Sequence, residues 1–96
     1  KNHKIQTQNI AVPIGKIRFV IYDCRDESKT KGRLLIFELG RPDAYQLLTI
    51  PPQVWYGFQC ISVSPALLVN CVDYAHSTSE SVVLDSTDTS IPYIWT

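Results

Sequence analysis

The stretch Lys16-Ile17-Arg18-Phe19-Val20-Ile21-Tyr22 decides the fold class, because its apolar side chains repeat with a period of two. Ile17, Phe19 and Ile21 share one face of an extended chain, whereas Lys16, Arg18 and Tyr22 share the other. β-Branched and aromatic residues, which make up most of the stretch, favour strands. The pattern therefore predicts a half-buried β-strand with one face on a hydrophobic core.

Similar patterns recur on both sides of this stretch. Further strands are predicted at Asn9–Val12, Arg33–Leu39, Tyr45–Ile50, Tyr56–Ser62 and Leu67–Val72. Turn residues separate them, as in the polar run Asp26–Gly32 and the Pro51-Pro52 pair. No long window has helical periodicity, and only Asp43–Leu48 could form one helical turn. Short strands with such punctuation are typical of an antiparallel sandwich or barrel.

Composition limits the possible partners. The chain has 96 residues, with 9 Lys and Arg against 9 Asp and Glu, so we expect one domain over residues 1–96 and no nucleic-acid partner. Its apolar runs are too short to span a membrane, and no signal-peptide pattern is found. The first residue is Lys1 rather than Met, and the chain contains no Met, so we expect further residues upstream.

The three cysteines, Cys24, Cys60 and Cys71, are odd in number and have no C-x-x-C spacing. Free cysteines are often buried as small hydrophobic residues, and we expect this for two or three of them. Only His3 and His76 could join them at a zinc ion, which makes a metal site improbable. Reduced thiols predict a cytoplasmic protein.

Two stretches carry a family resemblance. Residues 15–32 contain D-x-R followed by S-x-T-x-G, and residues 50–58 read I-P-P-Q-V-W-Y-G-F. Cys71-Val72-Asp73-Tyr74 and Glu80 follow in that order. Together these motifs resemble the dTDP-4-dehydrorhamnose 3,5-epimerases, the sugar-nucleotide epimerase branch of the cupins. The closing segment, from Leu84-Asp85 to Ile91–Trp95, is also similar, so the resemblance covers about residues 5–95.

The resemblance implies an all-β fold, a cupin-type antiparallel jelly-roll β-barrel. It also implies a reaction beside the ketone of a nucleotide-linked 4-keto-6-deoxy sugar, in surface polysaccharide biosynthesis such as that of dTDP-rhamnose. In such chemistry a His held by a carboxylate removes a proton, a donor stabilises the oxyanion, and a Tyr returns the proton on the other face. No metal or other cofactor is required. His3 is the candidate base, although the family's His would fall at or just before Lys1.

The chain departs from the family at several of its functional positions. The family's Lys, motif His, motif Gly and catalytic Tyr fall on Gln8, Tyr56, Gln53 and Val69. Tyr74 and Glu80 match, but they are more peripheral in the family. Tyr56 also occupies a position at which metal-binding cupins place a His ligand, which argues further against a metal.

Several residues have two interpretations. Gln6 and Gln8, with His3, form either a polar pocket wall or an exposed edge strand. Arg18 either captures a diphosphate or lies on a solvated face. Trp55 or Tyr56 either stacks on a base or sugar, or packs in the core or at a dimer contact.

Other polar residues have simpler expectations. Asp23 and Arg25, with Ser28 and Thr30, are expected to build a turn with a local ion pair. Tyr74 is a further candidate for substrate binding. It and the other tyrosines could replace the missing phenol only where the fold brings them to the site.

Two classes of function stay open on the sequence alone. The chain is either a sugar-nucleotide epimerase-like enzyme or a non-catalytic cupin that binds a sugar nucleotide or serves as a structural homodimer. We expect a homodimer that exchanges or pairs edge strands, because the chain lacks some of the family's first strands.

Overall fold

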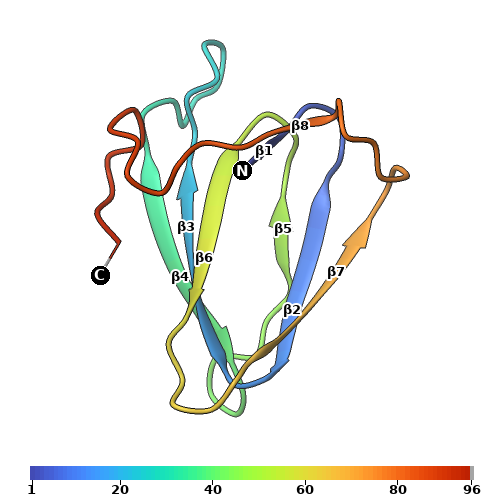
Figure 1. The fold of residues 1–96 in the computed structure, drawn as a ribbon, viewed down its shortest axis with the longest axis vertical. Coiled ribbons are helices and arrows are strands. Elements are labelled where there is room, and N and C mark those ends of the chain that lie inside the picture. The colour runs from blue at the N-terminus through green and yellow to red at the C-terminus, as the bar shows by residue number, and fades with distance from the viewer. Residues whose placement is uncertain (96) are drawn as a thin grey trace.

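A computed structural model describes residues 1–95 as eight β-strands in two antiparallel sheets (Figure 1). The strands are β1 (Asn2–His3), β2 (Gln8–Ile14), β3 (Lys16–Tyr22), β4 (Leu34–Gly40), β5 (Leu48–Ile50), β6 (Trp55–Cys60), β7 (Leu67–Val72) and β8 (Ser81–Val82). The described residues form no α-helix, so none of them could cross a membrane as a helix. The predicted all-β, antiparallel class is confirmed.

The two sheets face each other, with β4, β3 and β6 on one side of Figure 1 and β5, β2 and β7 on the other. The larger sheet has the order β4-β3-β6-β1-β8, and the smaller sheet has the order β5-β2-β7. β3 lies between β4 and β6 in the larger sheet, where Phe19 lies opposite both Phe37 of β4 and Phe58 of β6. The stretch that decides the fold class therefore anchors the larger sheet.

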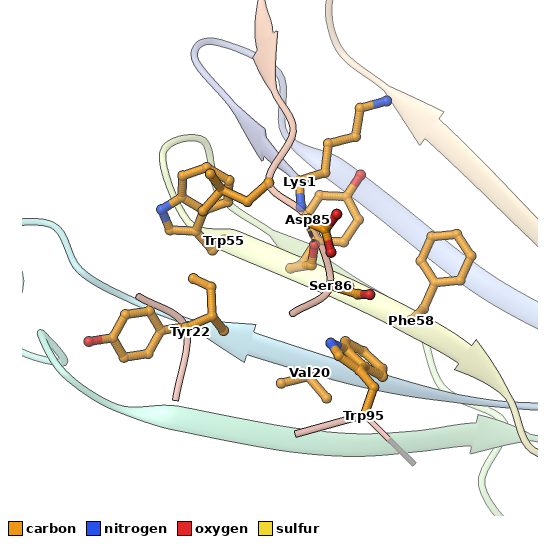
Figure 2. A pocket seen from close by; sticks show the side chains of 12 residues that line it. Lys1, Val20, Tyr22, Trp55, Phe58, Asp85, Ser86 and Trp95 are labelled. Atoms are coloured by element: carbon orange, nitrogen blue, oxygen red, sulfur yellow. Dashed lines mark hydrogen bonds between the residues drawn. The ribbon is translucent and has the colours of Figure 1, made fainter. Parts of the chain in front are cut away.

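The predicted alternation of β3 is visible in its burial. Ile17 and Phe19 are buried in a core with Ile10 and Val12 of β2. Val20 points to the opposite face, yet only 2% of its surface is exposed. The C-terminal segment covers this face, as Figure 2 shows for Trp95 beside Val20.

Gly57 makes the close approach of that segment possible. A Cβ at position 57 would lie 2.8 Å from Cζ2 of the Trp95 indole, which is too short for a real contact. The absence of a side chain lets the indole lie against β6.

The strand predictions differ from the structure mainly at their ends. Leu67–Val72 is correct as predicted, whereas the strand expected at Tyr45–Ile50 is reduced to Leu48–Ile50. The possible helical turn at Asp43–Leu48 is wrong. Gly40 and Ala44 exchange two backbone hydrogen bonds of 3.0 Å, which close a tight turn in place of a helix.

The expected burial of the cysteines is also wrong, since all three thiols are exposed. Cys71 lies opposite Asn9 on the outward side of the smaller sheet, and Cys60 is the last residue of β6. Cys24 lies in the loop after β3. Position relative to the two sheets, rather than residue type, decides burial here.

The loop after β3 has the expected ion pair. The Asp23 carboxylate accepts hydrogen bonds of 3.0 Å from both Nε and NH2 of Arg25, and it also accepts from the hydroxyls of Ser28 and Thr30. The bonds from Arg25 outweigh the effect of burial and hold the pKa of Asp23 well below its usual range. The D-x-R and S-x-T motifs are thus one turn-forming network.

Substitution of Phe19 by Ala tests the position of the core. Phe19 is fully buried, so Phe19→Ala should lower the free energy of unfolding by about 3–5 kcal/mol through lost contacts and a residual cavity. The neighbouring Phe58 is 53% exposed, and Phe58→Ala should cost about 1 kcal/mol or less. Urea unfolding of both variants measures the difference, and equal losses would contradict this assignment of the core.

Candidate active site

Residues from the two ends of the chain meet at β1. This short strand lies between β6 and β8, with Asn2 opposite Trp55 on one side and His3 opposite Ser81 on the other. Because Tyr56 follows Trp55 and Glu80 precedes Ser81, His3 lies between a phenol and a carboxylate that are distant in sequence.

The first half of the site is a hydrogen-bonded pair formed by His3 and Glu80. Nδ1 of His3 lies 2.6 Å from Oε1 of Glu80, and only 8% and 6% of the two residues' surfaces are exposed. Oε2 of Glu80 accepts hydrogen bonds from the backbone N–H groups of Ile5, at 3.1 Å, and Gln6, at 2.9 Å. Within residues 1–95, the hydrogen bonds to this carboxylate thus come from the segment 3–6.

These bonds fix the charge of Glu80 and the tautomer of His3. Burial alone would raise the pKa of Glu80, but the hydrogen bonds from His3, Gln6 and Ile5 outweigh it and hold the pKa at about 2. An ionised carboxylate can only accept hydrogen bonds, so Nδ1 of His3 carries the proton that lies between them. In the neutral imidazole, Nε2 then carries the lone pair and is the basic atom of the site.

The second half of the site is Tyr56. Its hydroxyl lies 3.1 Å from Nε2 of His3, and the two rings are stacked with their centroids 5.8 Å apart. Because Nε2 is the acceptor, the phenol donates this hydrogen bond. Burial and the negative charge of Glu80 raise the pKa of Tyr56, so the hydroxyl keeps its proton at neutral pH.

A chain of side-chain amides extends the polar cluster from β1 toward β7. Nε2 of Gln6 donates to the Tyr74 carbonyl at 2.9 Å, and Nε2 of Gln8 donates to Oε1 of Gln6 at 3.3 Å. Nδ2 of Asn70 in turn donates to Oε1 of Gln8 at 2.5 Å. Gln6 and Gln8 are buried, which agrees with a polar interior wall rather than an exposed edge strand.

The structure places the other candidate residues away from His3. Arg18 points outward, where its Nε and NH2 both donate to Oε2 of Glu38. Tyr74 contributes its backbone carbonyl to the cluster, while 54% of the residue is exposed. Trp55 neighbours Tyr56 in β6 and therefore faces the other side of the sheet.

Trp55 lines a cavity of about 220 Å³ beside β6 (Figure 2). Tyr22 and Trp95 form part of the same lining, together with Asp85 and Ser86 of the C-terminal segment. Tyr56 also belongs to this lining, whereas His3 and Glu80 lie on the inner side of β6 and do not line the cavity.

Two residues of the site were not given a role by the sequence. Glu80 matched a motif, but the family resemblance made it peripheral, and Asn70 had no assigned role. No local signal in the sequence singles out Glu80, because its burial, which requires a partner, is set by the fold. Val69, at the family's Tyr position, lies opposite Ala11 of β2 on the outer side of β7, and 44% of it is exposed.

The turn that precedes β6 keeps a shape suited to glycine. Gln53, at the position of the family's Gly, has a φ of 66°, in the left-handed region that favours glycine. Its backbone N–H donates to the His3 carbonyl at 2.6 Å. This turn therefore holds β1 as well as leading into β6.

No three His, Cys, Asp or Glu side chains within residues 1–95 are arranged to hold a metal ion. The side chains around His3 offer a base, a phenol, a carboxylate and amides. These groups are suited to proton transfer and to hydrogen bonding with a polar ligand.

The low pKa of Glu80 predicts a pH-dependent stability. Folding lowers this pKa from 4.5 to about 2, so the carboxylate stabilises the fold above pH 4.5, and this contribution is lost as the pH falls toward 2. Glu80→Gln should therefore be less stable than the wild type at pH 7, and the difference should shrink below pH 4.5. Urea unfolding from pH 7 to 2.5 measures it. The lowered pKa of Asp23 affects the stability of the wild type and of Glu80→Gln equally, so it cancels in the comparison. A stability difference that does not change with pH would contradict the contact between Glu80 and the segment 3–6.

The sequence and the fold both match known proteins. The family model described as dTDP-4-dehydrorhamnose 3,5-epimerase matches residues 1–96. A protein of Haloferax volcanii, named "Probable low-salt glycan biosynthesis epimerase Agl13", is 36% identical over 84 residues. That match covers 83% of this chain and 53% of the relative. The Bacillus subtilis "Spore coat polysaccharide biosynthesis protein SpsL" is 33% identical over 67 residues, which cover 70% of this chain and 44% of the relative.

A solved structure gives the same fold. The dTDP sugar isomerase of Desulfovibrio desulfuricans superposes with a TM-score of 0.96 at 49% identity, over 98% of this chain and 60% of that one. The predicted cupin-type jelly-roll barrel is thereby confirmed. The chain spans about half the length of the curated relatives that it matches. With a family model that matches its whole length and a fold shared with a dTDP sugar isomerase, the chain belongs to the dTDP-4-dehydrorhamnose 3,5-epimerase family.

Proposed function

We propose that the protein is a sugar-nucleotide epimerase-like enzyme of polysaccharide biosynthesis, in which His3 is the base and Glu80 holds it. The hydrogen-bonded group Glu80–His3–Tyr56 is the observation that carries the proposal. It provides an imidazole whose Nδ1 is held by a carboxylate and whose Nε2 accepts a hydrogen bond from a phenol, inside a buried polar cluster. The named functions of the two curated relatives, in glycan and in spore coat polysaccharide biosynthesis, support the biological setting.

The substrate that we propose is a nucleotide-linked 4-keto-6-deoxy sugar. A proton on a carbon beside a ketone is acidic enough for an imidazole to remove, because the resulting charge moves to the keto oxygen. The buried amides of Gln6 and Gln8 would meet sugar hydroxyls at the same wall. Delivery of the product to dTDP-rhamnose synthesis, a homodimeric assembly and a cytoplasmic location belong to the same proposal.

A non-catalytic sugar-nucleotide-binding protein is the second candidate. It is favoured by Gln8, which stands where the family has a Lys. The position of Val69 on the outer side of β7 also favours it, because Val69 cannot supply an acid to the interior. A binding protein would retain affinity for the sugar nucleotide without exchanging its protons.

Deuterium exchange distinguishes the two candidates. The full-length protein incubated with dTDP-4-keto-6-deoxyglucose in deuterated water should introduce deuterium beside the ketone, as measured by mass spectrometry and proton NMR. His3→Gln should slow this exchange about 10²–10⁴-fold, because the general base is lost. His76→Gln is the matched control, since His76 is exposed and outside the cluster, and it should exchange at the wild-type rate.

If the protein binds the same sugar nucleotide in calorimetry but does not exchange deuterium, the binding-protein proposal holds and the enzyme proposal is rejected. Equal exchange by wild type and His3→Gln would reject His3 as the base. Sedimentation of the full-length protein tests the proposed dimer independently of the chemistry.

A further inference from the structure

The spacing of His3 and Tyr56 limits what the pair can do to one substrate. Their reactive atoms, Nε2 and the hydroxyl oxygen, are 3.1 Å apart. A base and an acid on opposite faces of one carbon would each stand about 3–3.5 Å from it, and hence about 6 Å from each other. Tyr56 is therefore too close to His3 to return a proton on the face opposite to the base.

The same spacing fits two neighbouring atoms of a ketone. With standard bond lengths, the carbonyl oxygen lies about 2.4 Å from the carbon that carries the acidic proton. Two protein groups about 3 Å apart can therefore reach this carbon and this oxygen from the same side. His3 would meet the carbon and Tyr56 the oxygen.

The chemical state of Tyr56 suits an oxygen contact. Because burial and the charge of Glu80 raise its pKa, the phenol carries its proton at neutral pH and can donate a hydrogen bond. An enolate oxygen requires such a donor as negative charge develops on it. A phenolate at this position would instead repel the charge.

Gln8, which stands at the family's Lys position, has hydrogen-bond partners within the cluster. Its Nε2 uses one N–H to donate to Gln6, and its Oε1 accepts from Asn70. By contrast, the Tyr56 hydroxyl is bonded to Nε2 of His3, the atom that must accept the substrate proton. Binding of the substrate would therefore free the hydroxyl when it occupies the base.

Solvent reaches the face on which Tyr56 lies. Phe58 and Cys60 follow Tyr56 at alternate positions of β6 and so share its face, and both are exposed. Of the Tyr56 surface itself, 8% is exposed. A ligand can approach the His3–Tyr56 pair along this part of β6.

We infer that Tyr56 is a catalytic residue that donates its hydroxyl hydrogen bond to the keto oxygen of the substrate and stabilises the enolate formed by His3. This role rests on the proposed function. Nε2 of His3 takes the proton, and the C–H electron pair forms the carbon–carbon double bond. The carbonyl π pair moves to the oxygen, and Tyr56 keeps its proton throughout. Protonation on the opposite face falls to another group or to water.

The test is Tyr56→Phe in the deuterium-exchange assay with dTDP-4-keto-6-deoxyglucose. Loss of one preorganised oxyanion donor should lower kcat for exchange about 10²–10³-fold, with a much smaller change in KM. Tyr45→Phe removes a phenol far from the cluster, beside Arg41, and should exchange as the wild type does. An unchanged kcat for Tyr56→Phe would overturn the inference.

A second measurement separates this role from positioning of the base. Nitrogen-15 NMR of His3 in Tyr56→Phe should still show the proton on Nδ1, because Glu80 sets the tautomer. A lower rate accompanied by a changed tautomer would overturn the inference, since Tyr56 would then act through His3.

Tyr56→His, which keeps an N–H donor, should exchange faster than Tyr56→Phe, and equal rates would also overturn the inference. If Tyr56→Phe does not fold by circular dichroism, Tyr56→Leu replaces it in this comparison. Absence of exchange in the wild type would reject the proposed function itself. Exchange in the wild type that Tyr56→Phe matches would reject only the role of Tyr56.

Discussion

The site depends on the contact between the Glu80 carboxylate and the segment that contains His3. Both carboxylate oxygens are used, one by the imidazole and the other by two backbone N–H groups. The same contact attaches β1 to the edge of the larger sheet, since Lys4 also donates a backbone hydrogen bond to the Glu80 carbonyl. A strand of two residues has little stability of its own, so Glu80 both helps to hold β1 in the sheet and supplies the charge that orients the base.

The two faces of the larger sheet pack against different parts of the chain. The inner face carries the core around Phe19 and, beyond it, the His3–Tyr56 pair. The outer face is covered by the C-terminal segment, which packs its indole against Gly57 and leaves an aromatic-lined cavity beside Trp55. The family's sequence motifs are distributed over both faces and over the turn at Asp23. The family's motifs in this chain therefore include residues that build turns and packing contacts as well as residues of the candidate active site.

The sequence predicted the strands because apolar periodicity is a local property, and β3 and β7 were located to the residue. It also identified His3, Gln6, Gln8 and Tyr56, which the fold brings together. It could not give the partner of His3, because that pairing joins residues 77 positions apart through the register of β1 against β8. Cysteine burial failed for a related reason, since it depends on which parts of each sheet the rest of the chain covers.

Trp55 and Tyr56 are adjacent in sequence but lie on opposite sides of one sheet, and this has an evolutionary consequence. A strand has a side-chain period of two, so inserting or deleting a single residue between Pro52 and Gly57 would exchange inside and outside along all of β6. The indole would then replace the phenol beside the imidazole, and Gly57 would no longer face Trp95. The length of the interval from the di-proline to this glycine thus decides which aromatic side chain lies beside the imidazole.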